Sequence, residues 1–215
     1  MLKAVLFDFD GTLADTTDAI LNSSRSVIAK MSLPQVSDDT IKKHIGLPLT
    51  EMFHDIYKAL DDSEAMHICE LYRQALDSEY YRLIKPFPGV SESLAWMKER
   101  ELRLGIVTSR HLKSTVFLSE MLGIKDYFDT MVGVDIVKNP KPAPDTVQVC
   151  LERFRIEPSE ALVVGDTRFD LQMGHNAGCK VCGVTYGNHT REMLEMEKPE
   201  YLVDDLRELC KLIQK

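Results

Sequence analysis

The sequence has no apolar stretch that is long enough to cross a membrane. A transmembrane helix needs about 18 or more consecutive apolar residues, and polar residues interrupt every apolar run of this 215-residue chain before that length. The first apolar segment meets an acid at Asp8 and is too short for a signal-peptide core. We therefore expect a cytoplasmic protein without membrane contact.

An excess of positive charge is also lacking. The chain has 26 lysines and arginines against 34 aspartates and glutamates, which gives a formal net charge of −8. A nucleic-acid-binding face needs basic residues to neutralise phosphates, so we expect no nucleic-acid partner. A small anionic substrate is still compatible, provided that local cations or a metal ion offset the negative field. No pattern in the chain indicates an oligomeric state.

Cysteine pairs that would form a zinc site are missing. Of the five cysteines, only Cys179 and Cys182 have a CxxC spacing, and neither a second such pair nor paired histidines accompany them. The surrounding segment, AGCKVCGVTYG, is typical of a buried strand in which cysteine is a small apolar filler. The sequence leaves a redox role for the two thiols open.

What the sequence does contain is an alternation of apolar runs and helical patterns. Short apolar runs predict strands at 3–8, 102–109, 130–134, 161–166 and 180–186, and a last strand and helix lie within 199–213. Apolar residues with a 3.6-residue period predict helices at 90–100, 112–122, 145–154 and 171–177. Nearly continuous apolar strands between helices are typical of a parallel sheet covered on both faces. We therefore predict an α/β fold.

One long segment departs from this alternation. Between residues 16 and 85 we find helical patterns and no convincing strand. The predicted helices run from Asp15 or Thr16 to about 31, from Ser37 to before 46, from 48 onward, and from 62 or 63 to about 84. Two prolines and a glycine at 85–90 suggest a hinge. We predict a core of residues 1–15 and 86–215 with an inserted all-helical cap domain at 16–85.

Polar side chains follow the predicted strands where each strand ends. In open parallel sheets, ligands bind beyond the carboxyl ends of the strands, so residues far apart in sequence are expected to meet at one edge. The residues that would meet there are Asp8, Asp10, Thr108, Ser109, Lys141, Asp166 and Asp170.

These residue types indicate phosphoryl transfer. Four carboxylates crowded together repel one another unless a cation joins them, and hard oxygen ligands favour Mg²⁺. Lys141 adds a positive charge, and Gly11 allows backbone N–H groups to approach an anion closely. A carboxylate nucleophile, a second acid, a metal ion and a lysine together suit a reaction through an aspartyl-phosphate.

Four segments in order resemble the motifs of the haloacid dehalogenase superfamily. They are DFDGTLADT at 8–16, VTSR at 107–110, KPAPD at 141–145 and GDTRFD at 165–170. The resemblance covers the whole chain, and the helical insert resembles the C1-type cap of the phosphoglycolate-phosphatase-like branch. It implies a Rossmann-like core and a Mg²⁺-dependent phosphatase acting on a small phosphorylated metabolite.

The resemblance also implies roles for individual residues. Asp8 would be the nucleophile that attacks phosphorus. Asp10 would protonate the leaving oxygen and later take a proton from water. Thr108 would hydrogen-bond the phosphoryl oxygens, and Lys141 would neutralise both them and Asp8. Further phosphate-binding groups would be the backbone N–H groups of Phe9, Asp10 and Ser109.

The implied metal site has three ligands from the chain. Mg²⁺ would be held by Asp8, by the main-chain carbonyl of Asp10 and by Asp166. Asp170 would support the site through its waters or through Lys141 instead of binding the ion directly.

Substrate choice is expected in the cap. Lys43 and His44 lie in the segment 42–53, which has a Gly-Leu-Pro turn at Gly46 and Leu47, and in relatives with this cap the corresponding loop reaches over the active site. Lys43 and His44 would touch the far end of the substrate or form a solvated helix end. Arg110 would face an anionic substrate or lie on the surface.

Several functions stay open within this resemblance. The nearest candidate substrate is phosphoglycolate or a comparable phosphoester, and inorganic pyrophosphate is an alternative. A β-phosphoglucomutase-like mutase is disfavoured by the apolar character of 46–49, and a dehalogenase by the acid at Asp10. A catalytically dead binding module is disfavoured because all four motifs are intact.

Overall fold

The computed structural model describes residues 1–214, and its centre is a parallel sheet. Within these residues the sheet has six strands in the order β5-β4-β1-β6-β7-β8, and every neighbouring pair is parallel. The strands are β1 (Ala4–Phe7), β4 (Arg103–Val107), β5 (Thr130–Val132), β6 (Ala161–Gly165), β7 (Lys180–Val184) and β8 (Tyr201–Val203). The predicted α/β fold with a parallel, Rossmann-like sheet is confirmed.

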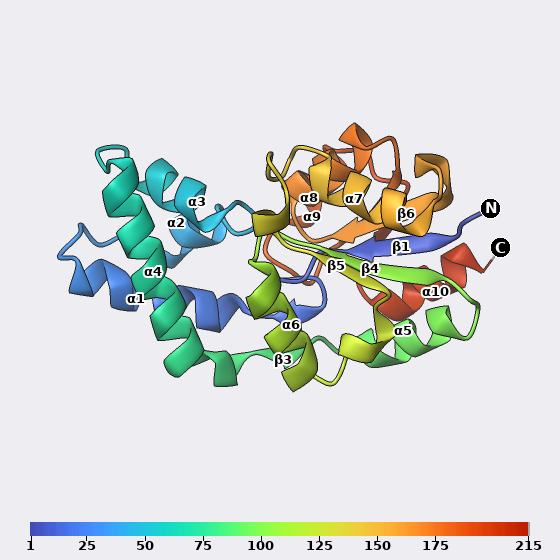
Figure 1. Ribbon diagram of the computed structural model, residues 1–215, viewed down its shortest axis with the longest axis horizontal. Coiled ribbons are helices and arrows are strands. Elements are labelled where there is room, and N and C mark those ends of the chain that lie inside the picture. Colours follow the sequence, from blue (N-terminus) through green and yellow to red (C-terminus); the bar gives the residue numbers. More distant parts are fainter. Residues whose placement is uncertain (215) are drawn as a thin grey trace.

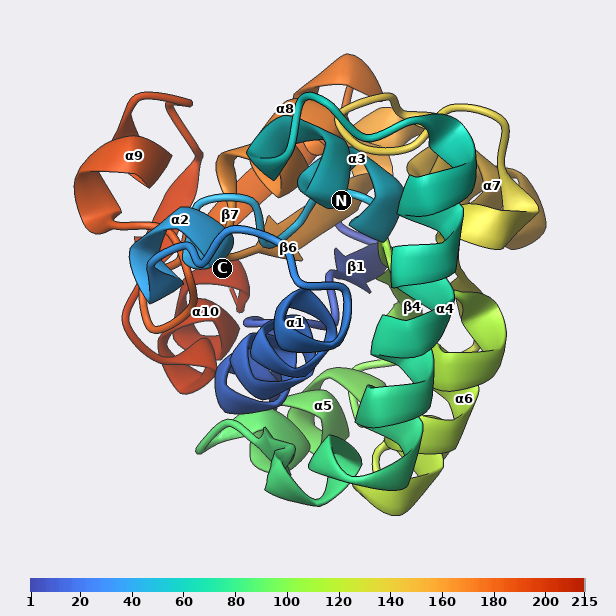
Figure 2. The same ribbon diagram turned by 90° about the vertical axis from the view of Figure 1, so that its left-hand side faces the viewer.

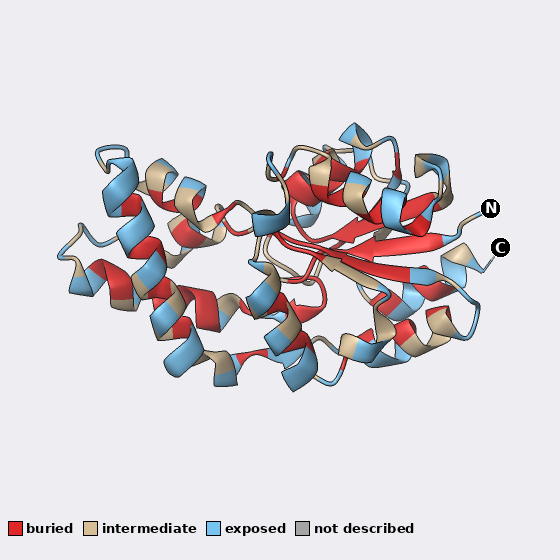
Figure 3. Ribbon diagram, in the orientation of Figure 1, coloured by how far each residue is buried: buried red, intermediate tan, exposed pale blue. Residues whose placement is uncertain are grey.

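Helices cover both faces of the sheet (Figure 1). They are α5 (Val90–Lys98), α6 (Leu112–Met121), α7 (Asp145–Phe154), α8 (Arg168–Asn176), α9 (Arg191–Glu195) and α10 (Leu206–Ile213). Leu6 of β1 packs into an apolar cluster with residues of α7 and α8, and Phe7 packs into a second cluster with residues of α5 and α10. Leu6 and Phe7 join different clusters because successive residues of a strand point to opposite faces of the sheet. Both faces of β1 are therefore buried (Figure 3).

A helical unit lies beyond one end of the sheet (Figures 1 and 2). It comprises α1 (Thr17–Lys30), α2 (Asp38–Lys42), α3 (Leu49–Ile56) and α4 (Asp62–Ser78). Ser37 caps α2 by accepting a hydrogen bond from the Thr40 N–H, and Asp61 and Glu64 form a capping box at the start of α4. Among residues 1–214, no helix combines the length and the apolar character that a membrane span requires.

One helix of this unit is shorter than predicted. The sequence pattern predicts a single helix to about 84, whereas α4 ends at Ser78. Glu79 leaves the helical conformation, with φ −121° and ψ −50°, and a 3-10 helix, η1 (Tyr80–Leu83), follows. The chain then returns to the core.

The chain passes between the sheet and the helical unit through a two-stranded ribbon. Strand β2 (Ala14–Asp15) pairs antiparallel with β3 (Lys85–Pro86), so the outgoing and returning segments are hydrogen-bonded to each other. The sequence predicts only a hinge at 85–90, because strands of two residues are too short to show a period. We propose that this ribbon separates a core of 1–15 and 86–215 from a cap domain of 16–85.

The two cysteines with CxxC spacing are buried. Cys179 directly precedes β7 and Cys182 lies within it, as the sequence predicts. Burial raises the pKa of the Cys179 thiol to about 12 and also raises that of Cys182. Thiolates, which thiol–disulfide exchange requires, are therefore scarce here.

The helical unit provides a matched pair of positions for a stability test. On α4, Ile68 is fully buried and Met66 is 62% exposed. We expect Ile68→Ala to lower the free energy of unfolding by about 2–5 kcal/mol, because it removes buried methyl groups and leaves a cavity. Met66→Ala should change it by less than about 0.5 kcal/mol. Urea denaturation followed by circular dichroism measures both, and equal effects would contradict the packing described here.

Candidate active site

Three neighbouring strands end in polar side chains. Asp8 follows β1, Thr108 follows β4 and Asp166 follows β6, and these strands are adjacent in the sheet. All three side chains are buried. The parallel direction of the strands therefore brings together at one edge residues that are 58 or more positions apart in the chain.

A buried lysine joins two of the carboxylates. Lys141 precedes α7, and its Nζ donates hydrogen bonds to Asp8 Oδ1 and Asp170 Oδ1, both at 2.5 Å. Burial alone would lower the pKa of Lys141, but the charges of Asp170 and Asp8 outweigh burial and raise that pKa. The ammonium group therefore stays charged although it is only 2% exposed.

Asp166 accepts three hydrogen bonds from two other segments. Its Oδ1 accepts one from Thr12 Oγ1 at 2.9 Å, and its Oδ2 accepts one each from the backbone N–H and the side-chain amide of Asn188, at 2.7 and 2.8 Å. Burial and then the charge of Asp170 raise the pKa of Asp166 to about 7, against the lowering effect of these hydrogen bonds. Asn188 belongs to none of the sequence motifs, because a single asparagine in a loop forms no pattern.

Two glycines make room for this carboxylate. A Cβ atom at Gly11 would lie 2.2 Å from Asp166 Oδ2, and one at Gly187 would lie 2.3 Å from Asp166 Cβ. Gly11 also has φ +85°, which L side chains rarely adopt. The glycine of the first motif thus lets the backbone approach Asp166.

Asp170 is held on both of its oxygens. Oδ1 accepts from Lys141, while Oδ2 accepts from the hydroxyl of Thr167 at 2.7 Å and from its backbone N–H at 2.9 Å. Thr167 in turn caps the N-terminus of α8. Asp170 is therefore fixed in the orientation in which it faces Lys141.

The buried acids suit a divalent cation. Asp8, Asp166 and Asp170 each offer a carboxylate oxygen, and these oxygens lie within 4.8 Å of one another. Burial raises the pKa of Asp8 against the lowering effect of Lys141, and neighbouring acids raise it further. Lys141 supplies one positive charge for three carboxylates, so this donor set, made only of oxygen, fits Mg²⁺.

Asp10 forms a two-pronged ion pair with Arg110. Arg110 Nη2 donates to Asp10 Oδ1 at 2.6 Å and Nε donates to Oδ2 at 3.0 Å, while Nη1 donates to Ser114 Oγ at 3.2 Å. The two side chains of the pair are only 9% and 14% exposed. The expectation that Arg110 could lie on the surface is therefore wrong, because its guanidinium is held in the site by Asp10.

Backbone donors are available beside these side chains. Within residues 1–214, the N–H groups of Phe9, Asp10 and Ser109 donate no hydrogen bond. Thr108 Oγ1 accepts from the Arg110 N–H at 3.2 Å, which leaves the hydroxyl proton of Thr108 free to donate.

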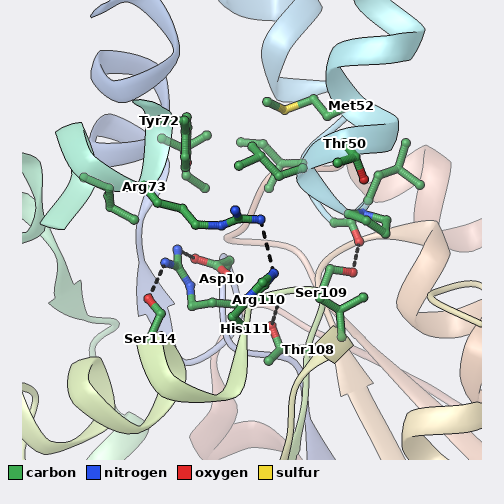
Figure 4. A pocket seen from close by; sticks show the side chains of 18 of the residues that line it. Asp10, Thr50, Met52, Tyr72, Arg73, Thr108, Ser109, Arg110, His111 and Ser114 are labelled. Atoms are coloured by element: carbon green, nitrogen blue, oxygen red, sulfur yellow. Dashed lines mark hydrogen bonds and ion pairs between the residues drawn. The ribbon is translucent and has the colours of Figure 1, made fainter. Parts of the chain in front are cut away.

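A cavity of about 240 Å³ separates this edge from the helical unit (Figure 4). Asp8, Asp10, Thr108, Ser109 and Arg110 line it from the core. From the helical unit it is lined mainly by apolar side chains, together with a few polar ones: Ile20, His44, Ile45, Gly46, Leu47, Pro48, Leu49, Thr50, Met52, Tyr72, Arg73, Leu76 and Asp77.

The predicted specificity residues divide into two groups. His44, Gly46 and Leu47 line the cavity, and Ser109 Oγ donates to the Gly46 carbonyl at 2.7 Å, which joins core and helical unit. Lys43 does not line it: this residue is the C-cap of α2 and is exposed. Of the two placements that the sequence leaves open for Lys43, contact with the substrate or a solvated helix end, the structure has the second.

Comparisons with known proteins agree with this geometry. A family model described as haloacid dehalogenase-like hydrolase matches residues 5–184. Pyrophosphatase PpaX of Bacillus velezensis is 34% identical over 209 residues, which is 97% of this chain and 94% of that protein. The "Putative pyrophosphatase PpaX" of Clostridium perfringens is 34% identical over 215 residues, 100% of this chain and 99% of the other.

A solved structure supports the same assignment. The "Putative haloacid dehalogenase-like hydrolase" of Bacteroides fragilis superposes with a TM-score of 0.93 at 27% identity, over 97% of this chain and 100% of that one. The resemblance inferred from the four motifs is therefore confirmed over nearly the whole length. The chain belongs to the family of haloacid dehalogenase-like hydrolases.

Proposed function

We propose that this hydrolase is a Mg²⁺-dependent phosphatase that acts on a small phosphorylated metabolite through an aspartyl-phosphate. The observation that carries the proposal is the arrangement of two acids in one cavity. Asp8 is paired with Lys141, and Asp10 is paired with Arg110. Asp8 shares its lysine with Asp170, whereas Arg110 contacts Asp10 alone, and carboxylates in different surroundings can take different chemical roles.

Asp8 has the features of a nucleophile. Lys141 binds its Oδ1, and within residues 1–214 its Oδ2 accepts no hydrogen bond from a side chain, so Oδ2 is the oxygen that would attack phosphorus. Attack forms the Oδ2–P bond and breaks the bond from phosphorus to the leaving oxygen. The ammonium of Lys141 would reduce the repulsion between Asp8 and the incoming phosphoryl group.

Asp10 would transfer the protons. It would give a proton to the leaving oxygen in the first step, and take one from the water that hydrolyses the acyl-phosphate in the second. Arg110 donates to both oxygens of Asp10, so one of these contacts would open for Asp10 to carry the proton that it gives to the leaving oxygen. The hydroxyl of Thr108 and the free N–H groups of Phe9, Asp10 and Ser109 would bind the phosphoryl oxygens.

The chain would hold Mg²⁺ through Asp8, the main-chain carbonyl of Asp10, and Asp166. When bound, the ion would supply positive charge that stabilises the oxygens of the transferring phosphoryl group. Thr12 and Asn188 fix the orientation of Asp166 for this role. Asp170 would act through Lys141.

Two substrate classes have specific support. Relatives at 34% identity carry the name pyrophosphatase, and a structural neighbour at 26% identity with a TM-score of 0.87 is called a "predicted phosphoglycolate phosphatase". The apolar side chains that line the cavity from the helical unit favour a substrate with an organic part. A small phosphoester is therefore our first candidate and inorganic pyrophosphate the second.

The nucleophile can be tested directly. We expect the wild-type protein to release phosphate from members of a panel of phosphoesters and pyrophosphate with Mg²⁺, and not with EDTA. Asp8→Asn should lower kcat by at least about 10³-fold, because the amide cannot form the acyl-phosphate. The matched control is Asp126→Asn, the same change at an exposed position, which should keep wild-type activity. Comparable turnover by Asp8→Asn and the control would remove Asp8 from this role.

The raised pKa values predict how metal binding depends on pH. Below about pH 7 the carboxyl of Asp166 holds a proton in the metal-free protein, and Mg²⁺ must displace it. The dissociation constant for Mg²⁺ from calorimetry should therefore rise about tenfold between roughly pH 7.5 and pH 6. An affinity that does not change over this interval would contradict the site.

The same shift has a consequence for stability. The folded pKa of Asp166 lies above its unfolded value of about 3.9, so the folded state binds the extra proton. The contribution of Asp166 to the stability of the metal-free protein therefore falls as the pH rises from about 4 to about 7. The increase in Tm on adding Mg²⁺ should accordingly be larger at about pH 7.5 than at about pH 6.

A further inference from the structure

One cation in the cavity has no anionic partner. Arg73 lies on α4, lines the cavity and is half-buried. Within residues 1–214 it forms no ion pair, and its single hydrogen bond runs from Nη2 to His111 Nε2 at 3.1 Å. A guanidinium that lines the cavity without a contacting carboxylate from the described residues keeps N–H groups with which it can bind an anion from outside the chain.

The acids that line the cavity from the core are in contact with other cations. Asp8 contacts Lys141, and Asp10 contacts Arg110. Asp77 also lines the cavity one turn along α4, but it is exposed and lies outside ion-pair distance of Arg73. Arg73 is therefore the one lining cation, among the described residues, whose charge is not offset by a contacting acid.

The neighbours of Arg73 are neutral hydrogen-bonding groups. Burial, and then the charge of Arg73, lower the pKa of His111, so its imidazole is neutral and Nε2 accepts from Arg73. Tyr72 precedes Arg73 on α4, and burial raises the pKa of its phenol. Figure 4 shows Arg73 reaching from α4 to His111, above the pair of Asp10 and Arg110.

We propose that Arg73, oriented by its hydrogen bond to His111, forms a subsite for a second anionic group of the substrate. The preferred substrates would then carry a carboxylate or a second phosphate in addition to the phosphoryl group that is transferred to Asp8. This inference rests on the proposed phosphatase function and narrows its substrate class. A guanidinium suits either anion because its N–H groups can bind two oxygens at once.

The location of the pair adds a structural consequence. Arg73 belongs to the helical unit, whereas His111 is the N-cap residue of α6 in the core. The hydrogen bond from Arg73 to His111 links the helical unit to the core, and an anion bound to Arg73 would hold the guanidinium in this position. A substrate without the second anion would lose this contact, so the subsite would act mainly on KM.

A pair of matched substrates measures the effect of the second anionic group alone. Phosphoglycolate and its amide have nearly the same shape and differ by one negative charge. We would measure kcat/KM for both with wild-type protein, Arg73→Met, Arg73→Lys and Arg82→Met. The last variant makes the same change at an exposed arginine of η1 that does not line the cavity.

The expected result is a change in the ratio of the two kcat/KM values. Wild-type protein and Arg82→Met should both prefer the carboxylate by about 10–100-fold, the range for a hydrogen bond to a charged group. Arg73→Met should bring the ratio near one, largely through KM, and Arg73→Lys should restore part of it. A ratio in Arg73→Met equal to that of wild-type protein, with the fold intact by circular dichroism, would overturn the subsite.

Binding separates this inference from the proposed function. Calorimetry with phosphoglycolate and its amide on Asp8→Asn, with and without Arg73→Met, tests the subsite in the absence of turnover. If wild-type protein hydrolysed no phosphoester while the preference in binding depended on Arg73, the phosphatase proposal would fail and the subsite would stand. If the protein hydrolysed phosphoesters without any preference for the second anion, the phosphatase proposal would stand and the subsite would fail.

Discussion

The structure depends on how it offsets the charge of its buried carboxylates. Asp8, Asp166 and Asp170 are nearly inaccessible to solvent, and burying an ionised carboxylate without a partner is among the most costly events in folding. Lys141 contacts two of the three at 2.5 Å, and hydrogen bonds from Thr12 and Asn188 support the third. Removing one member of such a buried pair typically costs about 3–5 kcal/mol, so the lysine is a structural as well as a chemical necessity.

The sheet makes this charge arrangement possible. Strands β4, β1 and β6 are adjacent and parallel, so their carboxyl ends deliver side chains to one edge. Helix α8 then starts at Thr167, which places Asp170 against Lys141. Hydrogen-bonded strands and a capped helix thus position the motif residues next to one another in space, although these residues lie far apart along the chain.

Most of the fold follows from patterns that a sequence displays locally. Apolar runs predict all six strands of the sheet, because strands buried on both faces are nearly continuous in hydrophobicity. The rule that parallel strands end at one edge also places Asp8, Thr108 and Asp166 together. The two-residue strands β2 and β3 leave no such pattern, and neither does the early end of α4.

What the sequence could not provide are partners chosen by tertiary structure. Arg110 has two plausible roles in the sequence, and only the folded chain shows that it binds Asp10. Asn188 and Arg73 belong to no motif. The role of a loop asparagine or a helical arginine depends on the residues that it contacts in the folded chain. Lys43 and His44 are neighbours in sequence at the end of α2, but Lys43 is exposed to solvent and only His44 lines the cavity.

The two parts of the molecule contribute different kinds of group to the cavity. The core brings acids that are paired with cations of the core, and these pairs suit the chemistry of phosphoryl transfer. The helical unit brings apolar side chains and Arg73, whose charge no acid of the described chain offsets by contact. A substrate with a second anion would complete the charge balance at the junction of core and helical unit. The contact between that anion and Arg73 would then contribute both to the choice of substrate and to the link between helical unit and core.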